Sequence, residues 1–148
     1  DRVRGRAGQG SPQETAALQT LSTAWVARGC AEDLDAAEPV LCELRERQAT
    51  AYGPESWRVM SVDGLMGLRL ARLGETARAE AVLVEAACAL LDQPDAPPLA
   101  RRATLDRLIT FYDGLGAGTF AALWRSLSPG VSTPGPRGTL PADAQPDQ

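Results

Sequence analysis

The chain of 148 residues contains no histidine, no lysine and no asparagine, so all 15 of its basic side chains are arginine. Without histidine, a Ser-His-Asp or Cys-His arrangement cannot form within this chain, which removes two common routes to nucleophilic catalysis. The three cysteines, Cys30, Cys42 and Cys88, are scattered without a CxxC spacing and offer no zinc ligand set. The sequence therefore predicts no catalytic residue, no metal site and no cofactor.

Long apolar runs are also missing. The best of them, from Ala81 to Leu91, is interrupted by Glu85, which excludes a transmembrane helix or a signal peptide within these residues. The net charge is −4, from 15 basic and 19 acidic side chains, so no overall field favours nucleic acid. We therefore expect neither membrane contact nor a nucleic-acid partner for this segment.

Cys42 and Cys88 fall inside predicted helices, where cysteine usually behaves as a small buried hydrophobe. Unpaired thiols favour a reducing compartment. We therefore expect a cytoplasmic location, and a periplasmic placement behind a membrane anchor outside this sequence remains open.

What the sequence does contain is a pattern that returns every 42 residues. Ala37, Ala79 and Ala121 begin equivalent segments, and Gly74 and Gly116 stand five residues before the second and third of them. A fixed period of about 20–50 residues is typical of repeat arrays, in which each unit buries its apolar face by stacking on a neighbour. Such arrays usually work as binding surfaces, so the pattern favours a binding function over a catalytic one.

Apolar residues at helical spacing predict six helices, and no stretch of period-2 alternation argues for a strand. Ser11-Pro12 opens the first helix, because proline is preset for a first helical turn, and Gly29 ends it. The other five are predicted over about residues 34–51, 55–73, 76–92, 99–115 and 119–127. The predicted fold class is therefore all-α. Residues 1–10 are expected to be a flexible linker, and the Pro/Gly-rich residues 128–148 a disordered tail.

The segment GETARAEAVL, residues 74–83, resembles the tetratricopeptide repeat (TPR), in its 42-residue kinesin-light-chain-like form. In that family small residues lie where the two helices of a hairpin cross, and a glycine closes the turn. Gly67, Ala79 and Ala86 match the small positions, and Gly74 matches the turn. Two antiparallel helices can approach to about 8–10 Å only where the side chains at the crossing are short, which supports the same interpretation physically.

The resemblance covers residues 11–127 and implies three antiparallel helix pairs stacked as a right-handed TPR-like α-solenoid. The repeats would span about residues 11–52, 53–94 and 95–127. Ile109 stands where the family usually has a small residue, which predicts looser packing in the last pair.

Residues 53–127 look like the final repeats found behind bacterial serine/threonine protein kinase domains. The linker that begins at Tyr52-Gly53-Pro54 is similar to the connection common between such repeats. Position 1 is Asp, which predicts a fragment of a longer protein. The resemblance therefore implies the C-terminal part of a larger bacterial signalling or regulatory protein, with a kinase as one option.

The leading functional hypothesis is a non-catalytic module that binds a peptide or protein. In the family the first helices of the pairs line a concave groove, and by position eight residues would line it here: Gln19, Thr23, Leu68, Arg72, Asp106, Arg107, Thr110 and Asp113. The charged members on the fifth predicted helix can also be read as a solvated face with modest pairing along the helix. The alternative function is structural, the capping end of a longer array or a surface packed on an adjacent domain.

Three tryptophans are the main aromatic anchors. Trp25 and Trp124 match core positions of the repeats. Trp57 lies beside the linker at a helix start, where either a structural role or surface recognition is open.

Overall fold

The computed structural model describes residues 10–127 of the chain. These residues form six α-helices and no strand, so the predicted all-α fold is confirmed. The helices are α1 (Pro12–Arg28), α2 (Ala31–Tyr52), α3 (Trp57–Arg72), α4 (Thr76–Leu91), α5 (Pro98–Gly114) and α6 (Gly118–Ser126). The predicted tail over 128–148, and all of the predicted linker except Gly10, lie outside the described residues.

Serine side chains cap the N-terminal ends of α1 and α3. The Ser11 hydroxyl accepts a hydrogen bond from the Glu14 backbone N–H at 3.2 Å, and Pro12 occupies the first turn, where its missing N–H costs nothing. Ser56 caps α3 in the same way, accepting from the Val59 N–H at 3.4 Å. Since such caps satisfy otherwise orphaned donors, they fix where the two helices begin.

Gly74 ends α3 at the turn of the α3–α4 hairpin, as the sequence predicts. Its φ of 82° lies in the left-handed region, which glycine adopts without a Cβ penalty. The next N–H, of Glu75, bonds the Leu70 carbonyl at 3.0 Å, and the Gly74 N–H bonds the Ala71 carbonyl at 3.1 Å. This pair of bonds is a Schellman motif, which satisfies the last carbonyls of α3.

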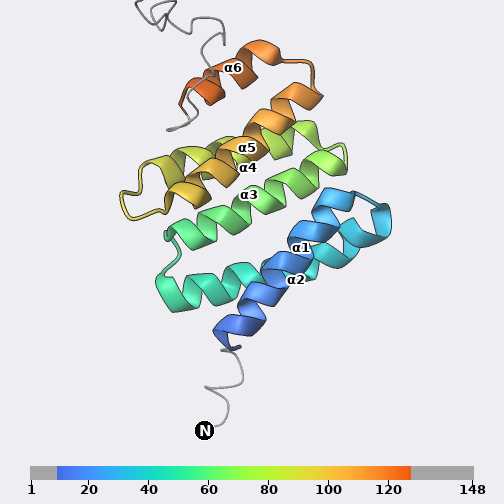
Figure 1. Cartoon of the computed structure of the whole chain (residues 1–148). Coiled ribbons are helices and arrows are strands. Elements are labelled where there is room, and N and C mark those ends of the chain that lie inside the picture. The colour runs from blue at the N-terminus through green and yellow to red at the C-terminus, as the bar shows by residue number, and fades with distance from the viewer. Residues whose placement is uncertain (1–9, 128–148) are drawn as a thin grey trace, which may run out of the picture.

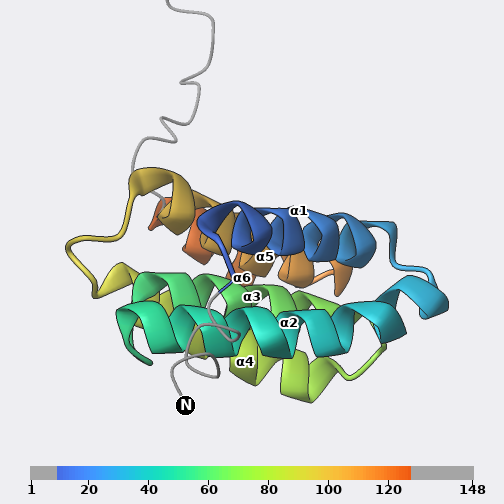
Figure 2. The same ribbon diagram turned by 90° about the horizontal axis from the view of Figure 1, so that it is seen from below.

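The helices follow one another along the molecule from α1 and α2 at one end to α6 at the other (Figure 1). Each helix packs on the next in the chain, and α3 also contacts both α1 and α5. Among the described helices, by contrast, no Cα atom of α2 lies within 8 Å of one in α4. In Figure 2, α1 and α5 lie on the side of α3 that faces away from α4. The odd-numbered helices α1, α3 and α5 are therefore joined by contacts into one layer, the odd-numbered layer, and α4 lies behind it.

The closest crossing in the core joins α3 to α4. A Cβ built on Gly67 would lie 2.8 Å from Leu83 Cγ, so only glycine fits this approach. Ala79 and Ala86, the other two small positions, are fully buried. The structure thus uses the small residues where the sequence predicted a helix crossing.

Two apolar clusters fill the interior. One joins α1, α2 and α3 through Val26, Leu41 and Val62, and Trp25 packs against it. The other joins α4, α5 and α6 and includes Ile109, with Trp124 packed against it. Both tryptophans therefore pack on core clusters, as the sequence indicated.

Several predicted positions differ in the structure. Cys42 and Cys88 are exposed instead of buried, because each lies on the side of its helix that no neighbouring helix covers. Leu21 of α1, at helical spacing from Leu18 and Trp25, is 43% exposed although this spacing predicts a buried face. The second helix begins at Ala31, three residues earlier than predicted, because Glu32 and Asp33 are favourable in a first turn.

The last helix is the least covered. Leu123 of α6 is 58% exposed, while Ala121 is fully buried against α5. The Phe120 ring is also largely exposed, and its one aromatic partner in the described part is Tyr112, with 5.4 Å between the ring centroids. A helix at the end of a stack has a neighbour on one side, which leaves the other side apolar and uncovered.

Candidate functional site

Three of the eight predicted groove residues line one depression between the C-terminal halves of α3 and α5. Leu68 and Arg72 come from α3, and Thr110 comes from α5. The depression has a volume of about 250 Å³, and we call it the α3–α5 depression. Its remaining lining residues are Ala71, Thr76, Phe111, Gly114 and Leu115.

Arg72 is the cation at this depression. Its side chain is exposed, and the structure gives it no carboxylate partner among residues 10–127. Its Cδ lies 3.5 Å from the place a Cβ on Gly29 would take, so the arginine stem passes over the end of α1. The charge of Arg72 is therefore available to a ligand that lies across α1, α3 and α5.

Gln19 and Thr23 lie on a separate part of the same layer. They line a shallow surface of α1 together with small residues, Ala16, Thr20, Ala24 and Ala27. The Thr23 hydroxyl donates to the Gln19 backbone carbonyl at 2.6 Å, which occupies its donor within the helix. The structure thus places these two residues on the odd-numbered layer without joining them to the α3–α5 depression.

The side chain of Arg107 makes a structural contact between α5 and α3. Its Nη1 donates to the Ser61 carbonyl of α3 at 3.1 Å, and the same atom lies 3.4 Å from where a Cβ on Gly64 would be. Burial lowers the pKa of the Arg107 guanidinium, because the charged form loses hydration between the two helices. The sequence could not show that this arginine reaches across to the α3 backbone.

The two predicted acidic groove residues have partners within the chain. Asp113 forms an ion pair with Arg125 of α6, and Asp106 lies 3.8 Å from Arg102 one turn earlier on α5. Both pairs are exposed, so each contributes little to stability. Their charges are nevertheless partly neutralised, which leaves Arg72 as the most open charge of the eight predicted residues.

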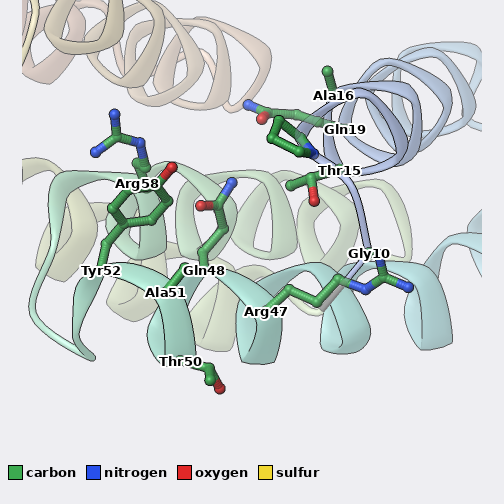
Figure 3. A pocket seen from close by; sticks show the side chains of 11 residues that line it. Gly10, Thr15, Ala16, Gln19, Arg47, Gln48, Thr50, Ala51, Tyr52 and Arg58 are labelled. Carbon is green, nitrogen blue, oxygen red and sulfur yellow. The ribbon is translucent and has the colours of Figure 1, made fainter. Parts of the chain in front are cut away.

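A second cavity was not predicted from the sequence. It lies between the start of α1, the last turns of α2 and the start of α3, and has a volume of about 510 Å³ (Figure 3). Arg58, Tyr52, Gln48 and Gln19 line it, and we call it the Arg58 pocket. One weak signal of this pocket is present in the sequence, since Tyr52 and Trp57-Arg58 flank a turn that must bring them together.

The Arg58 guanidinium lies close to the faces of two aromatic rings. Its guanidinium carbon lies 3.9 Å from the Tyr52 ring centroid and 4.4 Å from the Trp57 ring centroid. Such cation–π contacts stabilise the charge over the ring faces. Trp57 therefore has a structural contact that positions Arg58, which the sequence alone did not reveal.

Within residues 10–127, no group of three or more His, Cys, Asp or Glu side chains is placed to hold a metal ion. The same residues include no helix with the length and apolar character needed to cross a bilayer. Comparisons with protein-family models, with curated proteins and with solved structures find no match to this chain. The residues that line the α3–α5 depression and the Arg58 pocket are therefore the basis for a functional assignment.

Proposed function

We propose that the chain is a TPR-like module, stacked as an α-solenoid, whose odd-numbered helices bind an extended peptide or protein segment. The observation that supports this proposal is the unequal spacing of the two layers. Helix α3 contacts both α1 and α5, whereas α2 and α4 stay apart. A stack whose one layer is more closely spaced curves toward that layer, so the face carrying α1, α3 and α5 would be concave.

The α3–α5 depression supplies the chemistry that recognition needs. The exposed Leu115 and the half-buried Leu68 offer apolar surface, Thr110 a hydroxyl, and Arg72 an open charge. Peptide recognition typically combines burial of apolar area with a few polar contacts that fix orientation. Leu65, in contrast, is 2% exposed and belongs to the core, so it takes no part in this surface.

Random-peptide selection on the purified chain tests the proposal. We expect a selected peptide to bind the wild-type chain and to lose at least about tenfold in affinity to Arg72→Glu. Arg78→Glu is the matched control, because it makes the same charge change on α4 at an exposed arginine. Arg107→Glu is unsuitable as a groove variant, since it would leave a buried contact with α3 broken. Equal loss of affinity in Arg72→Glu and Arg78→Glu would overturn the groove assignment.

A structural role is the second candidate, and the uncovered side of α6 favours it. Phe120, Leu123 and Leu127 are each more than half exposed on this end helix. A further repeat or an adjacent domain of the parent protein could pack there, as at the end of a repeat array. Failure of peptide selection, together with tight packing of a neighbouring domain on α6, would favour this role over peptide binding.

The cellular context is a proposal that rests on the resemblance of residues 53–127 to repeats behind bacterial kinase domains. We place the module in a cytoplasmic signalling or regulatory protein, as a scaffold for a protein partner. The coding sequence around this segment tests the context. A kinase domain in the same reading frame would support it, and an unrelated reading frame would contradict it.

A further inference from the structure

The Arg58 pocket carries a positive charge that nothing in the described part of the chain neutralises. The structure gives Arg58 no carboxylate within 4.0 Å of its nitrogens among residues 10–127. The guanidinium carbon lies over the rings of Tyr52 and Trp57, and the structure gives the Arg58 N–H groups no hydrogen-bond acceptor among residues 10–127. An arginine held in this way loses less side-chain entropy when a ligand binds.

Gln48 supplies a second observation that points to a ligand. Its side chain is 8% exposed, yet the structure gives the carboxamide no hydrogen-bond partner among residues 10–127. Figure 3 shows this amide directed into the pocket, between Arg58 and Tyr52 on one side and α1 on the other. The residue is largely buried, but neither atom of its amide group is fully enclosed. A ligand oxygen in the pocket can therefore accept from its NH₂.

The net charge of the pocket also depends on Arg47, its other charged lining residue. Arg47 also lines the pocket but is already paired, with Glu43 one turn earlier and with Glu14 at 3.6 Å. Within residues 10–127, no Asp or Glu lines the pocket. One uncompensated positive charge therefore remains, that of Arg58.

We propose that the Arg58 pocket binds a carboxylate side chain, that of a Glu or Asp in the partner segment. A guanidinium edge matches the two oxygens of a carboxylate in a bidentate pair, and the Gln48 NH₂ can donate to one of them. A single open charge suits a monoanion, whereas a phosphate dianion would call for more cationic groups than the pocket holds. The proposal rests on the proposed function only for the source of the carboxylate.

Nuclear magnetic resonance of the ¹⁵N-labelled full chain tests the pocket with a small probe, the α-amide of N-acetylglutamate. We expect saturable shifts of the Gln48 side-chain amide and the Arg58 Nε–H signals. The neutral α-amide of N-acetylglutamine should bind at least about tenfold more weakly, because it lacks the charge that strengthens the hydrogen bonds. This comparison uses the wild-type chain and so does not depend on any variant folding.

Matched variants localise the effect. Arg58→Gln should weaken binding of the glutamate derivative by about tenfold or more, and Arg102→Gln, an exposed arginine of α5, should leave it unchanged. Equal binding of the two derivatives, unchanged binding in Arg58→Gln, or no saturable shift would each overturn the proposal. Inorganic phosphate binding as well as the glutamate derivative would overturn the carboxylate assignment. Because the probe is too small to need the α3–α5 depression, its failure would leave the groove proposal standing.

Discussion

Gly67 of α3 lies directly against Leu83 of α4, and a Cβ on the glycine would fall 2.8 Å from the leucine Cγ. The Leu83 atom is near the root of its side chain, and Leu83 is itself fully buried, so it cannot swing aside. This contact sets the separation of the two helices in the central hairpin. Helix α3 also contacts both α1 and α5, so it is the central helix of the odd-numbered layer.

Gly67→Ala should therefore lower stability by about 1–3 kcal/mol, since the added methyl overpacks the crossing. Alanine is the better helix former by about 1 kcal/mol, so the net change measures strain that exceeds this gain. Gly114→Ala is the matched control, because a Cβ there meets nothing within 4 Å. Urea denaturation of both variants checks the prediction, and a Gly67→Ala chain as stable as Gly114→Ala would contradict it.

Arg69 links α3 to α2, and its replacement should lower the free energy of unfolding. Its Nε donates to the Leu34 carbonyl at 2.7 Å, and its Nη2 lies 3.1 Å from a Glu38 carboxylate oxygen. Arg69→Leu should cost about 2 kcal/mol, mostly from the buried hydrogen bond, because the Glu38 end of the ion pair is exposed. Arg78→Leu removes an exposed pair of the same kind and should change stability by less than about 0.5 kcal/mol. Thermal melts of the two variants that coincide would contradict this account of Arg69.

Tyr112 should make stability fall at alkaline pH. Burial, together with the hydrogen bond that its hydroxyl donates to Glu80 at 2.8 Å, raises the pKa of Tyr112 to about 12 from 10.0. The protonated phenol is thus stabilised in the folded state. Its contribution is fully present below pH 10 and is lost as the pH rises from 10 to about 12. The free energy of unfolding of the wild-type chain should fall more steeply across this range than that of Tyr112→Phe. Parallel pH curves would contradict the assignment.

The three thiols provide a direct check on which helix faces are open. Cys30, Cys42 and Cys88 are all free and exposed. Each should therefore react with a thiol reagent in the folded chain, without the delay that burial would impose. Titration before and after denaturation should give the same count, three thiols per chain. A native count below the denatured count would show that at least one cysteine face is covered.

The sequence predicted the helices and turns well, because these depend on short-range chemistry. The left-handed glycines at 29 and 74 and the small residues at 67 and 79 lie where local pattern indicated them. The groove was harder to predict, since a helical position specifies a face but not the partner of a long side chain. Arg107 turned out to bond the α3 backbone, which no spacing along α5 could reveal.

The Arg58 pocket was missed for a related reason. Its two key side chains, Gln48 and Arg58, come from different helices and line one pocket only after α2 and α3 are folded around the intervening turn. The prediction that Cys42 and Cys88 are buried is wrong, because residue type alone does not decide which face of a helix is covered. Cys42 lies beside the buried Leu41, on a face that no helix covers.

The measurement that tests the central claim most directly is amide shift mapping with a selected peptide on the ¹⁵N-labelled chain. If the odd-numbered layer is the binding face, the largest shifts should fall on Leu68, Arg72 and Thr110, around the α3–α5 depression. Helix α4 should stay nearly unchanged after Thr76, which itself lines the depression, because the rest of α4 lies behind that layer. Shifts confined to α2, α4 or α6 would contradict the account.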